Sequence, residues 1–140
     1  MRKILLGLCI ALSIISHDAL AGVEVTIHKP TQKMYVSVDG QPTYEWRVST
    51  AVRGYRTPAG VYKPYWLHKN HYSSIYDNAP MPYSVFFFGN YAVHGTTEVK
   101  NLGRRASHGC VRLLIENART LFMLVQQYGK QNVRIVIEPA

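Results

Sequence analysis

Short β-branched and aromatic segments, several with alternating apolar and polar positions, run through most of the chain after residue 22. They are VEVTIH (23–28), KMYVSV (33–38), TYEWRVST (43–50), YSVFFF (83–88), YAVHG (91–95) and VRIVIE (133–138). Asp39-Gly40 and Gly89-Asn90 stand between neighbouring segments and are typical of hairpin turns. The pattern therefore predicts a mainly β domain.

One segment has the helical period instead. Past Arg112, apolar side chains recur at the spacing of a single helix face, at Ile115, Ala118, Leu121, Phe122 and Val125. Gly129 can end this helix because glycine tolerates the backbone of a C-terminal cap. We expect one main α-helix in the second half of the chain.

The middle of the chain fits neither period. RTPAG (56–60) predicts a Pro/Gly turn before VYKPYWL (61–67). Residues 68–82, HKNHYSSIYDNAPMP, are polar, aromatic and proline-bearing with no clear period, which predicts a loop over a site or a short irregular helix. With no internal repeat or linker, residues 22–140 are expected to form a single domain.

The first 21 residues have the pattern of a secretory signal peptide. Arg2 and Lys3 precede an apolar run at 4–15, and ALA at 19–21 is a small-residue cleavage signature. The alternative is an uncut membrane anchor, although the run is short for a membrane span. No later run is long enough, so we expect no integral membrane span in the mature protein.

The formal net charge of +8 suits an anionic neighbour such as a cell wall, although such a charge also simply keeps small domains soluble. No basic run resembles a nucleic-acid-binding stripe, so we expect no nucleic-acid partner.

The chain has two cysteines, and removal of a signal peptide would leave only Cys110. An odd cysteine in an exported protein is reactive, paired with another chain, or buried and inert. The flanking residues of SHGC (107–110), with a second HG at 94–95, favour a reactive thiol with a histidine base.

These residues resemble a known family. HG at 94–95 and NLGRRASHGCVRL at 101–113 resemble the catalytic motif of the L,D-transpeptidases, the YkuD domain family; RTPAGVY (56–62) and APMPYSVFFF (79–88) are also similar. The resemblance implies a β-sandwich-like fold with one main helix after the catalytic cysteine. It also implies action on peptidoglycan stem peptides and inhibition by carbapenem-type β-lactams.

The resemblance gives roles to the motif residues. Cys110 is expected to be the nucleophile and His94 the proton donor and acceptor, oriented by the backbone carbonyl of Gly95. Gly109 is expected to supply an N–H, together with that of Cys110, to the developing oxyanion.

Four more residues have candidate roles with plainer alternatives. His108 is expected to support the loop or the thiolate, or else to be an ordinary loop residue. Arg112, Ser107 and Tyr83 are candidates for substrate binding; a guanidinium suits the carboxylates of a stem peptide. Arg112 could instead be structural, and Tyr83 a core or rim aromatic.

The reaction we expect is transfer of an acyl group from Cys110 to a second stem, which forms a 3→3 cross-link and releases D-Ala. Hydrolysis of the same thioester, an L,D-carboxypeptidase activity, is the alternative. Remote alternatives are an inactive wall-binding module and a zinc hydrolase using His94, His108 and Cys110 or the pair His68 and His71. We expect no cofactor and no metal, and a periplasmic location at the cell wall.

Overall fold

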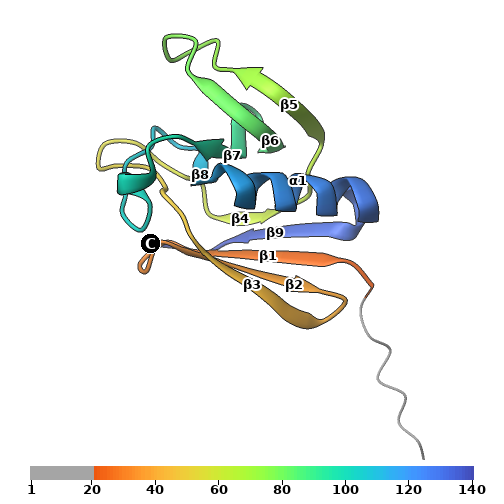
Figure 1. Cartoon of the computed structure of the whole chain (residues 1–140). Coiled ribbons are helices and arrows are strands. Elements are labelled where there is room, and N and C mark those ends of the chain that lie inside the picture. The colour runs from red at the N-terminus through yellow and green to blue at the C-terminus, as the bar shows by residue number, and fades with distance from the viewer. Residues whose placement is uncertain (1–20) are drawn as a thin grey trace, which may run out of the picture.

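A computed structural model describes residues 21–140, so all but the last residue of the predicted signal peptide (1–21) lies outside the described residues. The described chain forms two β-sheets and one long helix (Figure 1). The first sheet has the order β3-β2-β1-β9-β4, with β1 at Val23–His28, β2 at Lys33–Val38, β3 at Gln41–Arg47, β4 at Gly60–Tyr62 and β9 at Val133–Ile137. The second has the order β5-β6-β7-β8, with β5 at Trp66–Tyr72, β6 at Pro80–Phe88, β7 at Tyr91–Thr96 and β8 at Val111–Leu114. The long helix α1 spans Ile115–Tyr128, and two 3₁₀ turns lie at Val99–Asn101 (η1) and Lys130–Asn132 (η2).

The helix α1 runs between the two sheets (Figure 1) and shares one apolar core with both. The buried side chains of α1 are Ala118, Leu121, Phe122 and Val125, which match four of the five positions of the predicted apolar face. They join core residues from β1 and β9 below and from β6 and β7 above. The mainly β, sandwich-like fold with one main helix is therefore confirmed. No helix within residues 21–140 is long and apolar enough to cross a membrane.

The parallel pairing of β7 with β8 positions the motif residues. His94 lies opposite Arg112, and Val93 lies opposite Val111. The connection between these strands passes through η1 and the loop at 102–110, which carries the SHGC motif. Cys110 immediately precedes β8, so the parallel register places it beside Ala92, two residues before His94 on β7.

Some predicted boundaries are wrong. The segment predicted as a strand at 43–50 leaves the first sheet after Arg47, because Ser49 forms a two-way backbone bridge with Arg112 of β8. Residues 111–114 form strand β8, which was not predicted because the helical spacing of apolar residues follows directly after it. The helix α1 begins only at Ile115. Gly129 ends α1 with φ of 85°, as expected.

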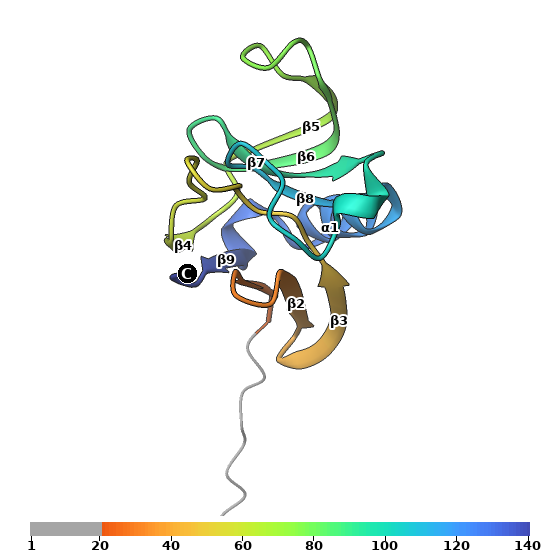
Figure 2. The same cartoon turned by 90° about the vertical axis from the view of Figure 1, so that its left-hand side faces the viewer.

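The loop predicted at 68–82 is also wrong for most of its length. Residues 68–72 belong to β5 and 80–82 belong to β6, and these strands pair antiparallel from Trp66 with Phe86 to Tyr72 with Pro80. Proline is tolerated here because the β6–β7 pairing begins only at Val85, so this part of β6 is bonded on one side alone. We call the two-stranded projection at residues 68–84 the hairpin arm; it extends away from the rest of the fold in Figure 2.

Candidate active site

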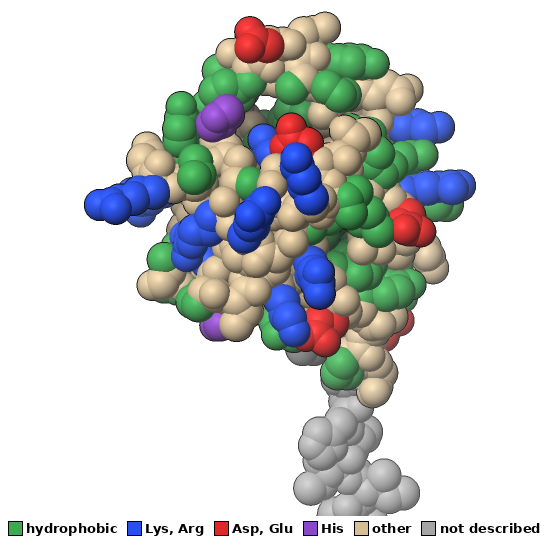
Figure 3. Space-filling model, turned by 60° about the vertical axis from the view of Figure 1, so that its left-hand side comes forward, with side chains coloured by type: hydrophobic (Ala, Val, Ile, Leu, Met, Phe, Trp, Pro, Cys, Tyr) green, Lys and Arg blue, Asp and Glu red, His purple; other side chains and the backbone are tan. Residues whose placement is uncertain are grey.

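The arm, the end of β7 and the loop before β8 enclose a cleft of about 590 Å³. It opens beneath the tip of the arm, and Lys and Arg side chains gather on the surface below it (Figure 3). Of the residues singled out in the sequence, the cleft is lined by His94, Ser107, His108, Gly109, Cys110 and Arg112. Tyr83 is not among the lining residues.

His94 is buried at the end of β7, with 6% of its surface exposed. Its Nδ1 lies 2.7 Å from the carbonyl oxygen of Gly95, which confirms the predicted contact. Because a carbonyl only accepts hydrogen bonds, Nδ1 carries a proton and Nε2 of the neutral ring keeps a free lone pair. The pKa of His94 is lowered to about 4, and burial is the main cause. The hydrogen bond to Gly95 opposes this shift, whereas the charges of Arg112 and His71 add to it. The imidazole is therefore neutral at neutral pH.

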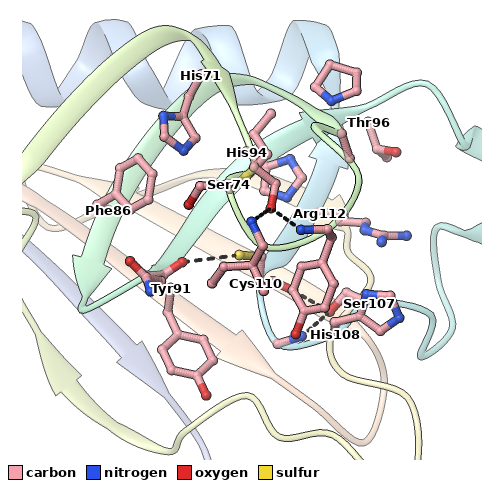
Figure 4. A pocket seen from close by; sticks show the side chains of 18 of the residues that line it. His71, Ser74, Phe86, Tyr91, His94, Thr96, Ser107, His108, Cys110 and Arg112 are labelled. Carbon is pink, nitrogen blue, oxygen red and sulfur yellow. Dashed lines mark hydrogen bonds between the residues drawn. The ribbon is translucent and has the colours of Figure 1, made fainter.

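Cys110 enters the same cleft from the start of β8 (Figure 4) and is a free thiol. It packs against a small apolar cluster of Met81, Phe86 and Ala92, and its Sγ lies 3.7 Å from the carbonyl oxygen of Asn90. Burial raises the pKa of the Cys110 thiol, while a hydrogen bond from the Ala92 backbone and the charge of Arg112 oppose the rise. The resting site therefore pairs a neutral thiol with a neutral imidazole.

Hydrogen bonds within the SHGC segment hold it in a tight turn. The Ser107 hydroxyl donates to the carbonyl of Cys110 at 2.6 Å and accepts the N–H of Gly109 at 3.1 Å. The buried Ser107 hydroxyl is therefore used inside the loop, and the substrate-binding role expected of this cleft residue stays a prediction. The Gly109 N–H, expected to face an oxyanion, is likewise bonded to Ser107.

Gly109 has a steric reason to be glycine. Its φ is 144°, and a Cβ at this position would lie 2.6 Å from Cε1 of Tyr91 and 3.1 Å from the carbonyl oxygen of Arg56. The backbone of the motif therefore packs directly against Tyr91, a cleft residue that follows a turn and carried no signal in the sequence.

His108 connects the motif to the tip of the arm. Its exposed ring contacts the ring of Tyr55 at a centroid distance of 4.6 Å and that of Tyr76 at 4.4 Å. Tyr76 lies in the turn between β5 and β6, so this contact closes the arm over the cleft. Neither tyrosine was identified from the sequence, because nothing in a single chain signals an aromatic contact across a cleft.

Arg112 already has a carboxylate partner. Its Nη1 lies 3.2 Å from Oε2 of Glu98, which also accepts the Asn101 side-chain amide at 3.2 Å. The guanidinium lines the cleft but is held at its edge by Glu98.

Tyr83, a candidate for the substrate groove, does not line the cleft, and the alternative given for it, a core aromatic, fits the structure. The residue has φ of 53° and packs against the apolar core, with its ring edge-on to Phe122 of α1 at 5.6 Å. A left-handed residue turns its side chain away from the regular alternation of the strand, which the sequence pattern does not reveal.

An aromatic wall completes the cleft and was not predicted. Phe86 stacks on Trp66 at 4.7 Å and contacts His71 at 4.9 Å. His71 packs in turn against His68 at 5.2 Å, so this histidine pair belongs to an aromatic cluster. Within residues 21–140, no group of three or more His, Cys, Asp or Glu side chains is arranged to hold a metal ion.

The fold and site together define a β-rich domain in which a thiol just before β8 and a buried imidazole on the neighbouring parallel strand β7 line one cleft. The chain belongs to the YkuD family, the L,D-transpeptidase catalytic domain, whose family model matches residues 22–137. Members of this family are cysteine-dependent enzymes.

Relatives agree with this assignment. The probable L,D-transpeptidase YbiS of Escherichia coli K12 is 37% identical over 68 residues, which cover 45% of this chain and 22% of the relative. An L,D-transpeptidase from Stackebrandtia nassauensis has a TM-score of 0.74 at 25% identity, covering 87% of this chain and 58% of that structure. An L,D-transpeptidase from Mycobacterium smegmatis has a TM-score of 0.75 at 20% identity, covering 85% and 59%. The chain thus spans under two thirds of the length of these proteins.

Proposed function

We propose that this protein is an L,D-transpeptidase that forms 3→3 cross-links between peptidoglycan stem peptides through a thioester on Cys110. The observation that carries this proposal is the His94 geometry. Gly95 fixes the proton on Nδ1, so Nε2 is the nitrogen available to the thiol in the same cleft.

The proposed first half-reaction is acylation. The Cys110 sulfur attacks the carbonyl carbon of the L,D peptide bond after the third stem residue, while Nε2 of His94 accepts the thiol proton. The tetrahedral intermediate collapses, the C–N bond breaks, and His94 returns the proton to the amine of the departing D-Ala. The backbone N–H of Cys110 is the proposed hydrogen-bond donor to the oxyanion. The backbone N–H of Gly109 can act as a second donor only after its hydrogen bond to the Ser107 hydroxyl breaks.

The proposed second half-reaction is transfer. A side-chain amine of another stem attacks the thioester carbonyl, a new amide forms, and the C–S bond breaks. His94 takes the proton from the attacking amine and returns it to the sulfur. Phe86 and Trp66 form an apolar wall of the cleft, which offers an attacking water no hydrogen-bond partner and so favours an amine over water. Attack by water instead would make the protein an L,D-carboxypeptidase.

The proposed setting follows from the substrate. Peptidoglycan lies outside the cytoplasmic membrane, so the protein would be exported, with residues 1–21 as its signal peptide, and would act in the periplasm at the cell wall. LdtMt1, an LD transpeptidase with a TM-score of 0.74 at 18% identity, was solved in complex with imipenem, and its alignment covers 84% of this chain and 59% of that one. We propose that Cys110 is likewise acylated by carbapenems.

The test uses residues 22–140, a purified disaccharide-tetrapeptide and mass spectrometry, with Cys110→Ala as the inactive variant. Alanine fits the small apolar environment of Cys110, so unfolding by urea checks that the variant is intact. A dimer that has lost one D-Ala establishes transpeptidation, and a monomer that has lost D-Ala establishes carboxypeptidation. Equal activity in Cys110→Ala, or no product and no carbapenem adduct in the parent, would contradict the proposal.

A further inference from the structure

A second hollow lies behind the motif loop, outside the cleft. Its volume is about 290 Å³, and three cationic side chains line it: Lys29, Arg56 and Arg105. The remaining walls are neutral side chains of the segment at 51–59 and the last two residues, Pro139 and Ala140. We call this hollow the cationic pocket.

Lys29 is unusual for a charged side chain because only 6% of its surface is exposed. Its Nζ donates to the carbonyl of Thr57 at 2.7 Å, which uses one of its three N–H bonds. Burial lowers the pKa of Lys29, and the charges of Arg105 and Arg56 lower it further. The two arginines are therefore close enough for their charges to act on Lys29.

Among the described residues, no acidic side chain lines the pocket, and the carboxylate at its wall is the main-chain one of the last residue, Ala140, which forms no ion pair with the three cations. Within residues 21–140, none of the three cations forms an ion pair with a carboxylate side chain. Like charges held together around a concave, partly desolvated space attract an anion more strongly than the same charges spread over a surface. Arg56 and Arg105 are exposed and so remain accessible to a ligand from solvent.

The cationic pocket contacts the catalytic loop directly. Thr57, whose carbonyl holds Lys29, donates its own hydroxyl to the carbonyl of Gly109 at 2.8 Å. Tyr55 lines the pocket on one side and contacts the ring of His108, in a tilted arrangement, on the other. The cleft and the pocket therefore lie on opposite sides of one short stretch of chain.

We propose that the cationic pocket binds a carboxylate of a peptidoglycan stem peptide, so that the enzyme holds its polymeric substrate at a second point beside the cleft. This inference rests on the proposed function for the identity of the polymer. Stem peptides supply free carboxylates, which are the anions that a Lys and two Arg side chains recognise by charge and hydrogen bonding.

The test measures binding at the pocket without turnover. The backbone amide signals of Lys29, Arg56 and Thr57 in residues 22–140 are followed by NMR during titration with three probes. These probes are a stem tripeptide with free carboxylates, the same peptide with its carboxylates amidated, and inorganic phosphate. Arg105→Gln removes one pocket charge. Arg104→Gln is the matched control, since Arg104 is an exposed neighbour that bonds to Asn101 and does not line the pocket.

The expected result is that the free tripeptide shifts these signals and the amidated peptide does not. Arg105→Gln should weaken that binding by roughly threefold to tenfold, and Arg104→Gln should match the parent. Equal binding of both peptides, no binding, or equal affinity in the two variants would overturn the proposal. Shifts with phosphate alone would overturn it in favour of a phosphate ligand. Because cleavage and carbapenem acylation are measured separately, failure here is distinguishable from failure of the proposed function.

Discussion

Cys110 and His94 share a cleft in which burial favours the uncharged form of each side chain. A preformed thiolate–imidazolium pair would instead require a lowered thiol pKa. We therefore expect the rate of Cys110 alkylation by iodoacetamide to keep rising from pH 6 to above pH 9, because the thiolate fraction grows only as pH approaches the raised pKa. Cys110 is the sole cysteine of residues 22–140, so mass spectrometry reports on this thiol alone.

His94→Gln is the comparison for this experiment, because it removes the imidazole while keeping a polar side chain. If the thiol is neutral at rest, the parent and the variant should have alkylation profiles of the same shape. A plateau in the parent beginning near pH 6, absent in His94→Gln, would show an ion pair and contradict the expectation.

Gly109 and Gly54 offer a matched pair of substitutions. Both have positive φ, 144° and 94°, so alanine costs backbone strain of roughly 1–3 kcal/mol at either position. Only at Gly109 does the new Cβ meet Tyr91 at 2.6 Å; at Gly54 nothing lies within 4 Å. Crowding of this kind typically adds about 1–3 kcal/mol. Urea unfolding should therefore show a clearly larger loss of stability for Gly109→Ala, and equal losses would mean that Tyr91 moves aside freely.

At the scale of elements, the hairpin arm is held over the cleft by the contact between Tyr76 and His108. The turn has its own backbone bonds, from Ser73 N–H to Ala79 O at 2.8 Å and from Ala79 N–H to Tyr76 O at 2.9 Å. Without the aromatic contact, these bonds should open more often. We expect Tyr76→Ala to speed hydrogen exchange at the Ser73 and Ala79 amides, as measured by NMR.

Tyr72→Ala is the control for the arm. Tyr72 lies in the same arm and is 54% exposed, and its ring makes no aromatic contact within the described residues. It should leave both exchange rates near those of the parent. If the two variants speed exchange equally, the arm is held by its own strand pairing rather than by His108.

The strands of the hairpin arm are among the elements that the sequence pattern did not predict. β1 and β2 have the predicted bounds and α1 buries the predicted face, because their alternation or helical period reflects burial on one face. The pattern of residues 68–82 has no such period, since the arm projects beyond the core and buries neither face continuously. Two prolines in β6 also argue for a loop, and only the one-sided pairing of this strand makes them compatible with a sheet.

At the scale of the whole molecule, the motif identified six of the residues that line the cleft but not their contacts with distant segments of the chain. The contact between His94 and the Gly95 carbonyl joins adjacent residues, and the family pattern pairs His94 with Cys110. The resemblance was therefore enough to predict this arrangement. Contacts such as Tyr76 with His108, or Lys29 with Thr57, join segments far apart in the chain. Such contacts depend on how the sheets and the arm pack together, which a single sequence does not encode in any local pattern.

Global stability should depend on pH through His94, which is buried at the cleft. Its pKa falls from 6.5 to about 4 on folding, so between these values the unfolded chain binds the proton more tightly. The stabilising effect of the neutral ring is complete above pH 6.5 and is lost as pH falls toward 4. Since each pKa unit corresponds to about 1.4 kcal/mol, the loss should approach about 3 kcal/mol.

Urea unfolding at several pH values between 7 and 4 checks this dependence, and His94→Gln supplies the reference because glutamine does not titrate. The free energy of unfolding should fall more steeply in the parent than in the variant across this range. Asp39, whose pKa is lowered by hydrogen bonds from the Gly22 backbone and Tyr128, contributes in both proteins and only toward the acidic end. Identical slopes in the two proteins would mean that the His94 ring is reached by solvent, and that the site does not hold a neutral imidazole by burial.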